Sequence, residues 1–517
     1  MNTPSIYQQA IFDWVRTGRG HAVVNAVAGS GKTTTIVEAA KLLASERVLF
    51  CAFNKHIQIE LEKRLPRNVT VKTIHGIGYS AVAASLGKLR LDDDKIRALV
   101  EFPARQIRRT LEQLHEKAIR DGGHPEAPAD FGDVCGWLRK LSHFARVSLT
   151  NHHDADALEG MADYYGIDVD PAVWSMVASA VREVIEESTR IARDDRRIAF
   201  DDMIFLAHAL ELRPSRYDWV IVDEAQDLSA AQRSLVLKCL APGGRLLAVG
   251  DPRQSIQGFA GADPESFTRL KEALDAIELP LSVCYRCPPN VLELAREIVP
   301  QIEAAPGAVD GVIEEVSVED VLRTAQEGDL ILSRRTAPAV SLCIALIGRK
   351  IPARVKGKDI GAALARDVRE ISEQRGFKMK AFGDFAAMWA EKRASKVAAK
   401  KGASEAQIDA VWDRHAGIMA CFEAFESKTA EDLARSIQEL FADERRSVTL
   451  STIHRAKGLE ADRVFILESH RLPFHFKRMQ PWEVFQEECL HYVALTRPRK
   501  ELYLVVDQKQ SEAKETP

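Results

Sequence analysis

The sequence of 517 residues contains no long hydrophobic run and no secretory leader pattern. No stretch approaches the roughly 18 consecutive apolar residues that a membrane-spanning helix requires. The first ten residues, MNTPSIYQQA, lack the basic and apolar regions of a signal peptide. We therefore expect a soluble, cytoplasmic protein that has no membrane partner.

Cysteine is sparse as well, with eight residues, and only Cys284 and Cys287 form a C-x-x-C pair. A zinc or iron–sulfur site needs more ligands than this pair supplies, and neither a second pair nor a histidine cluster accompanies it. We therefore interpret the cysteines as reduced thiols of a cytosolic protein.

The sequence also lacks an overall excess of basic residues, because its net charge at pH 7 is −4. This balance does not exclude a nucleic-acid partner, since a basic groove can lie within an acidic protein. The densest basic run comprises Lys392, Arg393, Lys396, Lys400 and Lys401. A run of this kind is commonly the solvated face of a helix, and a DNA-binding surface is the alternative.

Short β-branched runs, each followed by glycine or polar residues, recur along the chain with helical stretches between them. This alternation predicts an α/β fold with mainly parallel sheets. The expected strands form two sets, one at 22–27, 47–53, 69–74, 219–224 and 245–251 and the other at 329–333, 447–453, 463–468 and 501–506. Two α/β lobes in tandem are therefore expected.

Each lobe is interrupted by a stretch that is helical in pattern and poor in strands. We expect a first lobe at 1–85 plus 196–279, with a helical insertion at 86–195. We expect a second lobe at 280–369 plus 445–507, with a shorter helical insertion at 370–444. The composition of 508–517 predicts a disordered tail.

A candidate phosphate-binding loop, AVAGSGKTTT, follows the first expected strand and opens a helix. It fits the P-loop pattern G-x-x-x-x-G-K-[ST], except that Ala26 replaces the first glycine. Backbone N–H groups of such a loop and the helix N-terminus can surround phosphate oxygens. Lys32 is then expected to contact the β- and γ-phosphates of ATP, and Thr33 is expected to hold Mg²⁺.

The stretch WVIVDEAQDLS at 219–229 ends an apolar strand in two adjacent carboxylates. Neighbouring carboxylates at the mouth of a buried strand lose water and repel each other, so they need a compensating cation. We expect Asp223 to coordinate the Mg²⁺ held by Thr33, and Glu224 to orient and deprotonate the attacking water. An acidic surface turn after a core strand is the alternative interpretation.

Further motifs follow in a definite order. They are Gln8, AFNK (52–55), TIHG (73–76), DEAQD (223–227), GDPRQSIQGFAGA (250–262), CYRCPP (284–289), TIHRAKGLE (452–460) and YVALTRPR (492–499). In these motifs the chain resembles the UvrD/Rep/PcrA family of superfamily 1A DNA helicases over nearly its whole length. The resemblance implies two tandem RecA-like P-loop NTPase lobes that bind ATP between them, close around it and open after hydrolysis.

The resemblance also implies the roles of individual residues at the nucleotide. Gln8 would recognise the adenine edge, and Tyr285 would stack on the adenine ring. Gln254 would sense the γ-phosphate, while Arg286 and Arg497 would act as arginine fingers; for either arginine alone, a surface salt bridge is the alternative. The implied catalytic residues are Lys32, Glu224, Gln254, Arg286 and Arg497. The implied nucleotide-binding residues are Gln8, Ala28, Gly29, Ser30, Gly31, Lys32, Thr33, Thr34, Tyr285 and Glu460.

Single-stranded nucleic acid is held by backbone contacts together with aromatic stacking. The resemblance implies that Phe53 and Phe259 stack on bases, although core packing is the alternative for both. The other implied DNA-binding residues are Asn54, Thr73, His75, Thr452 and His454.

The sequence departs from the family pattern in several places. Gln257 replaces the aromatic residue of the usual QSIY, and Thr34 stands where many relatives have arginine. Only about 160 residues separate Arg286 from Thr449. The accessory domain of the second lobe is therefore expected to be much reduced, with 370–444 as its remnant.

The expected function is an ATP-dependent 3′-to-5′ single-stranded DNA translocase and helicase in DNA repair, recombination or replication. ATP and Mg²⁺ are the expected cofactors, and single-stranded DNA and duplex junctions are the expected partners. An ATPase subunit that gates a nuclease partner in a defence or repair complex is the main alternative. An RNA-directed remodeller and a non-enzymatic scaffold are two further alternatives.

Overall fold

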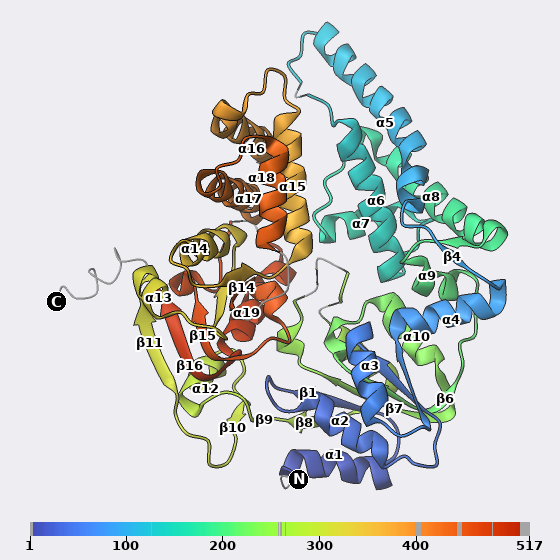
Figure 1. The fold of residues 1–517 in the computed structure, drawn as a ribbon. Coiled ribbons are helices and arrows are strands. Elements are labelled where there is room, and N and C mark those ends of the chain that lie inside the picture. The colour runs from blue at the N-terminus through green and yellow to red at the C-terminus, as the bar shows by residue number, and fades with distance from the viewer. Residues whose placement is uncertain are drawn as a thin grey trace. The chain divides into compact units, whose positions relative to one another are not determined.

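The computed structural model describes residues 4–125, 127–256, 258, 261–263, 265–398, 405–441, 447–477 and 479–506. By its internal contacts the chain divides into two units (Figure 1). The first comprises Met1–Ala26 and Gly31–Leu281, and the second comprises Val27–Ser30 and Ser282–Pro517. The tail expected at 508–517 lies outside the described residues.

A six-stranded parallel sheet forms the centre of the first unit, with strand order β3–β2–β6–β7–β1–β8. Its strands are β1 (Ala22–Ala26), β2 (Val48–Ala52), β3 (Val69–Thr73), β6 (Tyr217–Val222), β7 (Leu240–Gly250) and β8 (Ile277–Leu281). The interior strands are buried on both faces, as helix-covered parallel sheets require. Their carboxyl ends meet at one edge, where the P-loop and the DEAQD motif follow β1 and β6.

Helices cover both faces of this sheet. One face packs against α1 (Ile6–Thr17), α2 (Lys32–Lys41) and α3 (Lys55–Arg64). The other packs against α4 (Ile74–Leu86), α9 (Asp202–Ala209), α10 (Ala230–Lys238) and α11 (Ser266–Leu274). Among the described residues lie the short 3₁₀ helices η1 (Pro171–Val173), η2 (Ala225–Asp227), η3 (Pro252–Gln254), η5 (Met379–Ala381), η6 (Ile453–Ala456) and η7 (Ser469–Arg471).

Helix α1, which carries Gln8, is fixed to the sheet by Arg245 of β7. The Arg245 guanidinium lies 4.3 Å from the ring centre of Trp14 and 4.2 Å from that of Trp219. It also donates to the carbonyl oxygens of Trp14 and Val15 at the end of α1. Cation–π and hydrogen bonds of this kind hold the helix against rotation and so fix the side of α1 that faces the P-loop.

Four helices between β4 (Arg90–Leu91) and β5 (Arg197–Ile198) build a second core within the first unit. They are α5 (Lys95–Arg120), α6 (Phe131–Ser148), α7 (Ala155–Tyr164) and α8 (Trp174–Asp195), which lie side by side in Figure 1. At their base the Lys95 ammonium, 1% exposed, donates to Asp202 of α9 over 2.7 Å and to the Ser188 carbonyl over 2.7 Å. Arg146 of α6 pairs with the same carboxylate over 3.1 Å. These satisfied buried charges attach the helices to α9.

A second six-stranded parallel sheet forms the centre of the second unit, with strand order β11–β16–β15–β12–β14–β13. Its strands are β11 (Val312–Val316), β12 (Leu330–Ser333), β13 (Ala353–Val355), β14 (Val448–Thr452), β15 (Ala461–Ile466) and β16 (Pro498–Val505). The helices of this part are α12 (Pro289–Arg296), α13 (Val318–Thr324), α14 (Thr336–Gly348) and α19 (Pro481–Leu495), and β9 (Val283–Cys284) pairs with β10 (Glu303–Ala304). The predicted α/β fold with parallel sheets is confirmed.

The remaining helices of the second unit are α15 (Lys358–Ser372), α16 (Phe382–Ala398), α17 (Glu405–Ala424) and α18 (Ala430–Leu440). They share one apolar core with the sheet. Asp413 of α17 accepts hydrogen bonds from the N–H groups of Thr336 (2.7 Å) and Ala337 (2.8 Å) at the start of α14. The carboxylate thus caps a helix that has no capping side chain of its own.

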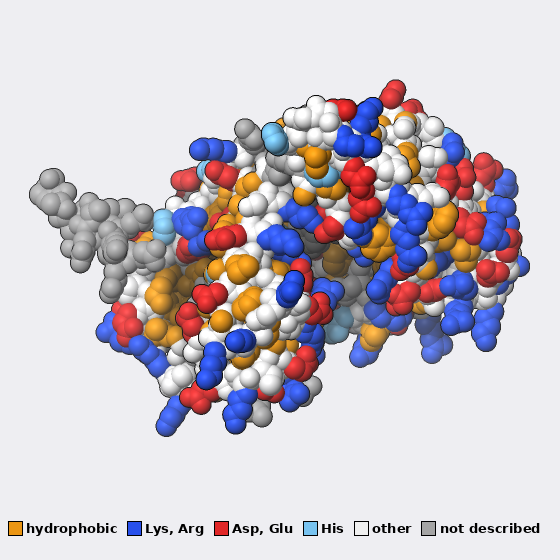
Figure 2. Space-filling view, turned by 90° about the horizontal axis from the view of Figure 1, so that it is seen from above, with side chains coloured by type: hydrophobic (Ala, Val, Ile, Leu, Met, Phe, Trp, Pro, Cys, Tyr) orange, Lys and Arg blue, Asp and Glu red, His pale blue; other side chains and the backbone are white. Residues whose placement is uncertain are grey.

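The basic run of α16 is partly neutralised within the second unit. Arg393 pairs with Glu370 over 2.5 Å and lies 4.7 Å from the ring centre of Trp389. Lys400 and Lys401 lie outside the described residues. On the face drawn in Figure 2, Lys and Arg side chains are interspersed with Asp and Glu.

Within the part of the chain that the structure describes, no helix is both long and apolar enough to span a membrane.

Candidate functional site

The loop between β1 and α2 has the backbone geometry of a phosphate cradle. Gly29 and Gly31 have φ angles of +67° and +75°, in the left-handed region that favours glycine. A Cβ on Gly29 would also lie 2.7 Å from the Cβ of Arg286 and 2.8 Å from the Sγ of Cys284. The Ser30 hydroxyl is buried and has no hydrogen-bond partner among the described residues. A phosphate oxygen would supply the partner that this hydroxyl lacks.

Two oxygen ligands meet at the start of α2. The Thr33 hydroxyl donates to Asp223 Oδ2 over 2.8 Å. Burial, reinforced by the charge of Glu224, raises the pKa of Asp223 to about 6. Mg²⁺ commonly takes one or two such protein ligands together with phosphate oxygens and water, so these residues fit a nucleotide-bound Mg²⁺. In the described ranges, no group of three or more His, Cys, Asp or Glu could hold a metal on its own.

Glu224 follows Asp223 in a strained backbone conformation. Its φ of 53° lies in the left-handed region, where a non-glycine residue costs on the order of 1 kcal/mol or more. Its carboxylate accepts a hydrogen bond of 2.6 Å from Gln226 Nε2. The surrounding structure has to maintain such strain, which occurs at active sites and also in turns such as that of Glu211.

Gln226 connects the DEAQD motif to the GDPRQ motif, a role that the sequence interpretation did not assign. Its Oε1 accepts from the N–H of Asp251 over 3.1 Å, while its Nε2 donates to Glu224. Gln254 Nε2 in turn donates to Asp251 Oδ2 over 2.8 Å. Burial raises the pKa of Asp251, and the charge of Lys32 opposes that rise. A continuous hydrogen-bonded path therefore joins the predicted catalytic carboxylate to the predicted γ-phosphate sensor.

Gln8 lies beside the P-loop in the first unit. A Cβ on Gly31 would be 4.0 Å from Gln8 Nε2. The same unit thus brings together the predicted residues Gln8, Gly31, Lys32, Thr33, Asp223, Glu224 and Gln254. Thr34 is exposed on the first turn of α2.

The predicted nucleotide residues of the second unit are adjacent to the P-loop segment Val27–Ser30, which belongs to that unit. The Tyr285 N–H donates to the Gly29 carbonyl over 2.9 Å, and its side chain is half-exposed. The Ala28 N–H donates to the Tyr492 hydroxyl over 2.9 Å. Both contacts fix the loop backbone without using the aromatic face of Tyr285.

Both predicted arginine fingers have internal partners. Arg286 pairs with Glu460 and donates to the Thr496 carbonyl over 3.1 Å. Glu460 also pairs with Arg499. Arg497 is 1% exposed and donates to the Val493 carbonyl over 2.8 Å and the Leu459 carbonyl over 3.2 Å. Their role as arginine fingers, and the nucleotide contact of Glu460, stay predictions.

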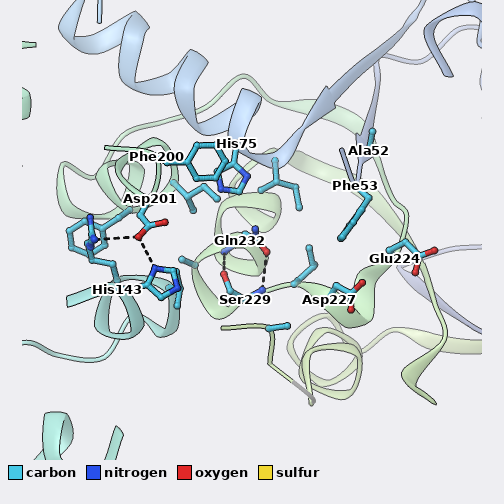
Figure 3. A pocket seen from close by; sticks show the side chains of 18 of the residues that line it. Ala52, Phe53, His75, His143, Phe200, Asp201, Glu224, Asp227, Ser229 and Gln232 are labelled. Atoms are coloured by element: carbon cyan, nitrogen blue, oxygen red, sulfur yellow. Dashed lines mark hydrogen bonds and ion pairs between the residues drawn. The ribbon is translucent and has the colours of Figure 1, made fainter. Parts of the chain in front are cut away.

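A cavity of about 400 Å³ adjoins the predicted catalytic carboxylate in the first unit (Figure 3). Phe53 at the end of β2, His75 of α4 and Phe200 before α9 line it together with Glu224. The rings of His75 and Phe200 are stacked with centres 4.2 Å apart. Phe53 and Phe200 are 47% and 54% exposed, so neither is a core residue. Exposed aromatic rings can serve as platforms on which the bases of a single strand stack.

Phe200 was not identified from the sequence. It lies in a loop between β5 and α9 with no periodic pattern, and its ring reaches the cavity only through the fold of the helical stretch before it. Asp201 beside it accepts from His143 of α6, with Nδ1 2.7 Å from Oδ2. The sequence signal that could have drawn attention to Phe200 is the adjacent acidic pair Asp201–Asp202, which follows a short strand.

Two predicted DNA-binding residues have a structural role. Asn54 Oδ1 accepts from the Ile57 N–H over 2.9 Å and caps α3. Thr73 Oγ1 accepts from the Gly76 N–H over 3.1 Å and caps α4. The caps orient the two helix N-termini that carry the neighbouring Phe53 and His75.

The predicted DNA-binding residues of the second unit lie at the carboxyl end of β14. Thr452 is buried there. Burial, together with the charges of Arg334 and Arg455, lowers the pKa of His454 to about 3. His454 is therefore neutral at pH 7 and can meet a phosphate only through a hydrogen bond. Phe259 lies outside the described residues.

Comparison with known families matches both parts of the chain. Residues 8–275 match the family model of the UvrD/REP helicase N-terminal domain, and residues 426–509 match that of the UvrD-like helicase C-terminal domain. The chain belongs to the UvrD/REP helicase family. The resemblance inferred from the ordered motifs is thereby confirmed, and two tandem RecA-like lobes follow from it.

Several relatives of this UvrD/REP chain carry helicase names. F-box DNA helicase protein 1 of Schizosaccharomyces pombe is 26% identical over 513 residues, which cover 93% of this chain and 55% of the relative. ATP-dependent DNA helicase UvrD2 of Mycobacterium tuberculosis is 26% identical over 554 residues, covering 94% and 76%. ATP-dependent DNA helicase PcrA of Staphylococcus aureus is 25% identical over 306 residues, covering 55% and 38%. The chain spans about half the length of the F-box relatives.

Proposed function

We propose that this UvrD/REP family protein is an ATP- and Mg²⁺-dependent DNA helicase that translocates 3′ to 5′ along single-stranded DNA. We place its activity in repair, recombination or replication. The direction and the pathway class rest on family membership. The ATP requirement is supported by the P-loop geometry and by the names of the relatives.

One observation carries the proposal: Glu224 belongs to two sites at once. It follows Asp223, the hydrogen-bond partner of Thr33, and it also lines the aromatic cavity that contains Phe53. A base stacked in that cavity would therefore lie next to the group that activates water. This arrangement supports DNA-dependent hydrolysis, because occupancy of the cavity can change the position of the Glu224 carboxylate.

Each residue then has a defined task. The P-loop amides and Lys32 hold the phosphates, while Thr33 and Asp223 hold the metal ion. Bound MgATP supplies the phosphoanhydride bond and the Lewis acid. Glu224 accepts the proton of the attacking water. Gln226, through Asp251, transmits movement of Glu224 to Gln254.

Family membership also supports a role for two arginines, Arg286 and Arg497. Arg286 and Arg497 would stabilise charge on the transferring phosphoryl group, an effect on the order of 10³-fold or more in rate. Arg286 has to exchange its pairing with Glu460 for the phosphate, and Glu460 keeps Arg499 as a partner when that happens. The protein therefore does not leave an unpaired carboxylate in the active state.

Phe53→Ala and Phe200→Ala are each expected to raise the concentration of single-stranded DNA that gives half-maximal ATPase stimulation. Loss of one stacked base costs about 1–3 kcal/mol, which corresponds to roughly 5- to 150-fold in affinity. The measurement is steady-state ATP hydrolysis titrated with oligo-dT and, in parallel, with oligo-U. Stronger stimulation by oligo-U would favour an RNA-directed remodeller.

Phe102→Ala is the matched control, because Phe102 of α5 is 70% exposed and does not line the cavity. Its half-maximal DNA concentration is expected to equal that of the unaltered protein. Equal values for the Phe53 and Phe200 variants as well would remove the cavity from the DNA-binding site.

A further inference from the structure

The side-chain amide of Gln8 is held in a single orientation by two neighbours. Gln8 Oε1 accepts from the Ser5 N–H over 3.0 Å, as part of the capping box that begins α1. Gln8 Nε2 donates to Thr35 Oγ1 of α2 over 3.0 Å. The Thr35 hydroxyl donates its own proton to the Gly31 carbonyl over 3.0 Å, so its oxygen can only accept from Gln8. The positions of the amide oxygen and nitrogen are therefore fixed.

The remaining hydrogen-bonding capacity of Gln8 matches adenine. A glutamine amide has two acceptor sites on Oε1 and two donor hydrogens on Nε2. Ser5 and Thr35 use one of each, and the described residues offer Gln8 no other side-chain hydrogen bond. One acceptor and one donor are left. The adenine edge presents the N6 donor and the N7 acceptor, whereas guanine presents two acceptors, O6 and N7.

Thr35 has no need of a hydroxyl for packing. It is 1% exposed and lies between α2 residues of the apolar core, where valine has nearly the same shape. Its bond to the carbonyl four residues earlier is an ordinary helical contact, which Thr189 of α8 makes to Ile185 over 2.8 Å. The contact to Gln8 distinguishes Thr35 from such a residue.

We propose that Thr35 is a positioning residue for adenine: it orients the Gln8 amide and connects that amide to the P-loop carbonyl of Gly31. The inference rests on the proposed ATPase function and adds the source of its base specificity. Thr35 itself is buried and acts on the nucleotide only through Gln8. The hydroxyl also joins the base-reading group to the phosphate loop, because one oxygen serves both Gln8 and Gly31.

Thr35→Val is expected to lower the ratio of kcat/KM for ATP to that for GTP by about fivefold, the equivalent of one hydrogen bond. The loss should come from a higher KM for ATP, with kcat nearly unaltered. Thr35→Ser, which keeps the oxygen, is expected to retain the ratio within about twofold. The measurement is steady-state hydrolysis of ATP and GTP at saturating oligo-dT, with melting temperatures to establish that each variant is folded.

A double-mutant cycle with Gln8→Ala separates orientation of the amide from a purely structural effect. If Thr35 acts through Gln8, Thr35→Val should leave the ATP-to-GTP ratio of the Gln8→Ala protein unchanged. Thr189→Val, which removes only the helical contact, should leave the ratio of the unaltered protein unchanged.

The inference would be overturned if Thr35→Val lowered kcat/KM equally for ATP and GTP. It would also be overturned if Thr35→Val lowered the ATP-to-GTP ratio further in the Gln8→Ala protein. The proposed function fails separately, if the unaltered protein hydrolyses no nucleotide. Hydrolysis of ATP by the unaltered protein with an unchanged ratio in Thr35→Val would leave the proposed function intact and remove only the role of Thr35.

Discussion

Lys32→Ala is expected to lower the rate of DNA-stimulated ATP hydrolysis on the order of 10³-fold, because a phosphate-binding cation is lost from the P-loop. Lys32 is the first residue of α2, directly after the left-handed Gly31, and its charge acts on the buried carboxyls of Asp223 and Asp251. The measurement is steady-state phosphate release at saturating ATP and oligo-dT.

Lys41→Ala is the matched control for the Lys32 variant. Lys41 lies at the opposite end of the same helix and forms an exposed pair with Glu38 over 2.7 Å. Such a pair contributes about 0–1 kcal/mol to stability, so turnover should remain close to that of the unaltered protein. Turnover in Lys32→Ala as high as in Lys41→Ala would defeat the assignment of the P-loop as the ATP site.

Glu224→Gln is expected to reduce ATP hydrolysis by about 10²- to 10⁴-fold, the usual contribution of a general base, while ATP binding is retained. Glutamine preserves the size of the side chain and can still hydrogen-bond to Gln226, but it cannot accept the proton of water. Binding is measured with a fluorescent ATP analogue in the presence of Mg²⁺, and hydrolysis is measured in parallel.

Glu211→Gln controls for glutamine in a left-handed backbone conformation, because Glu211 has a φ of 49° and is exposed in a turn after α9. Its hydrolysis rate and nucleotide affinity are expected to equal those of the unaltered protein. A Glu224→Gln protein that no longer binds the nucleotide would show that Glu224 supports the architecture of the loop instead of activating water.

The interior strands could be predicted from the sequence, whereas most of the edge strands could not. The nine expected strands correspond to β1, β2, β3, β6, β7, β12, β14, β15 and β16, which are mostly apolar because helices cover both faces. The strands β8, β11 and β13 were missed, and each lies at the edge of its sheet. Pro280 lies within β8, and β11 is largely exposed. Edge strands tolerate a proline and exposed positions, but a search for apolar, β-branched runs does not recognise strands of this kind.

The contacts of the site likewise differ in whether a local sequence pattern or only the tertiary fold specifies them. The pairing of Thr33 with Asp223 was predictable, because a P-loop and a carboxylate motif each follow a strand of one sheet. The contact between Gln226 and Asp251 depends on the adjacency of β6 and β7, which no local pattern specifies. The contact between Gln8 and Thr35 depends in the same way on how α1 packs against α2.

Phe200 shows the limit of motif reasoning most clearly. The motifs led to Phe53 and His75, since both follow strands in recognisable sequences. Phe200 completes the same cavity from a segment that returns after the four-helix stretch, and its ring stacks on His75. Its position follows from the buried charges that attach α5 and α6 to α9, including the Lys95–Asp202 pair.

Strand separation on two tailed duplexes shows whether the protein is a helicase and in which direction it moves. The duplexes have the same base-paired sequence, one with a 3′ single-stranded tail and one with a 5′ tail, and separation is followed with ATP and Mg²⁺. We expect separation of the 3′-tailed duplex alone, and none with the Lys32→Ala protein. Separation from the 5′ tail alone would contradict the proposed direction. Separation of neither duplex, with DNA-stimulated ATP hydrolysis retained, would contradict an autonomous helicase and favour an ATPase that acts with a nuclease or repair partner.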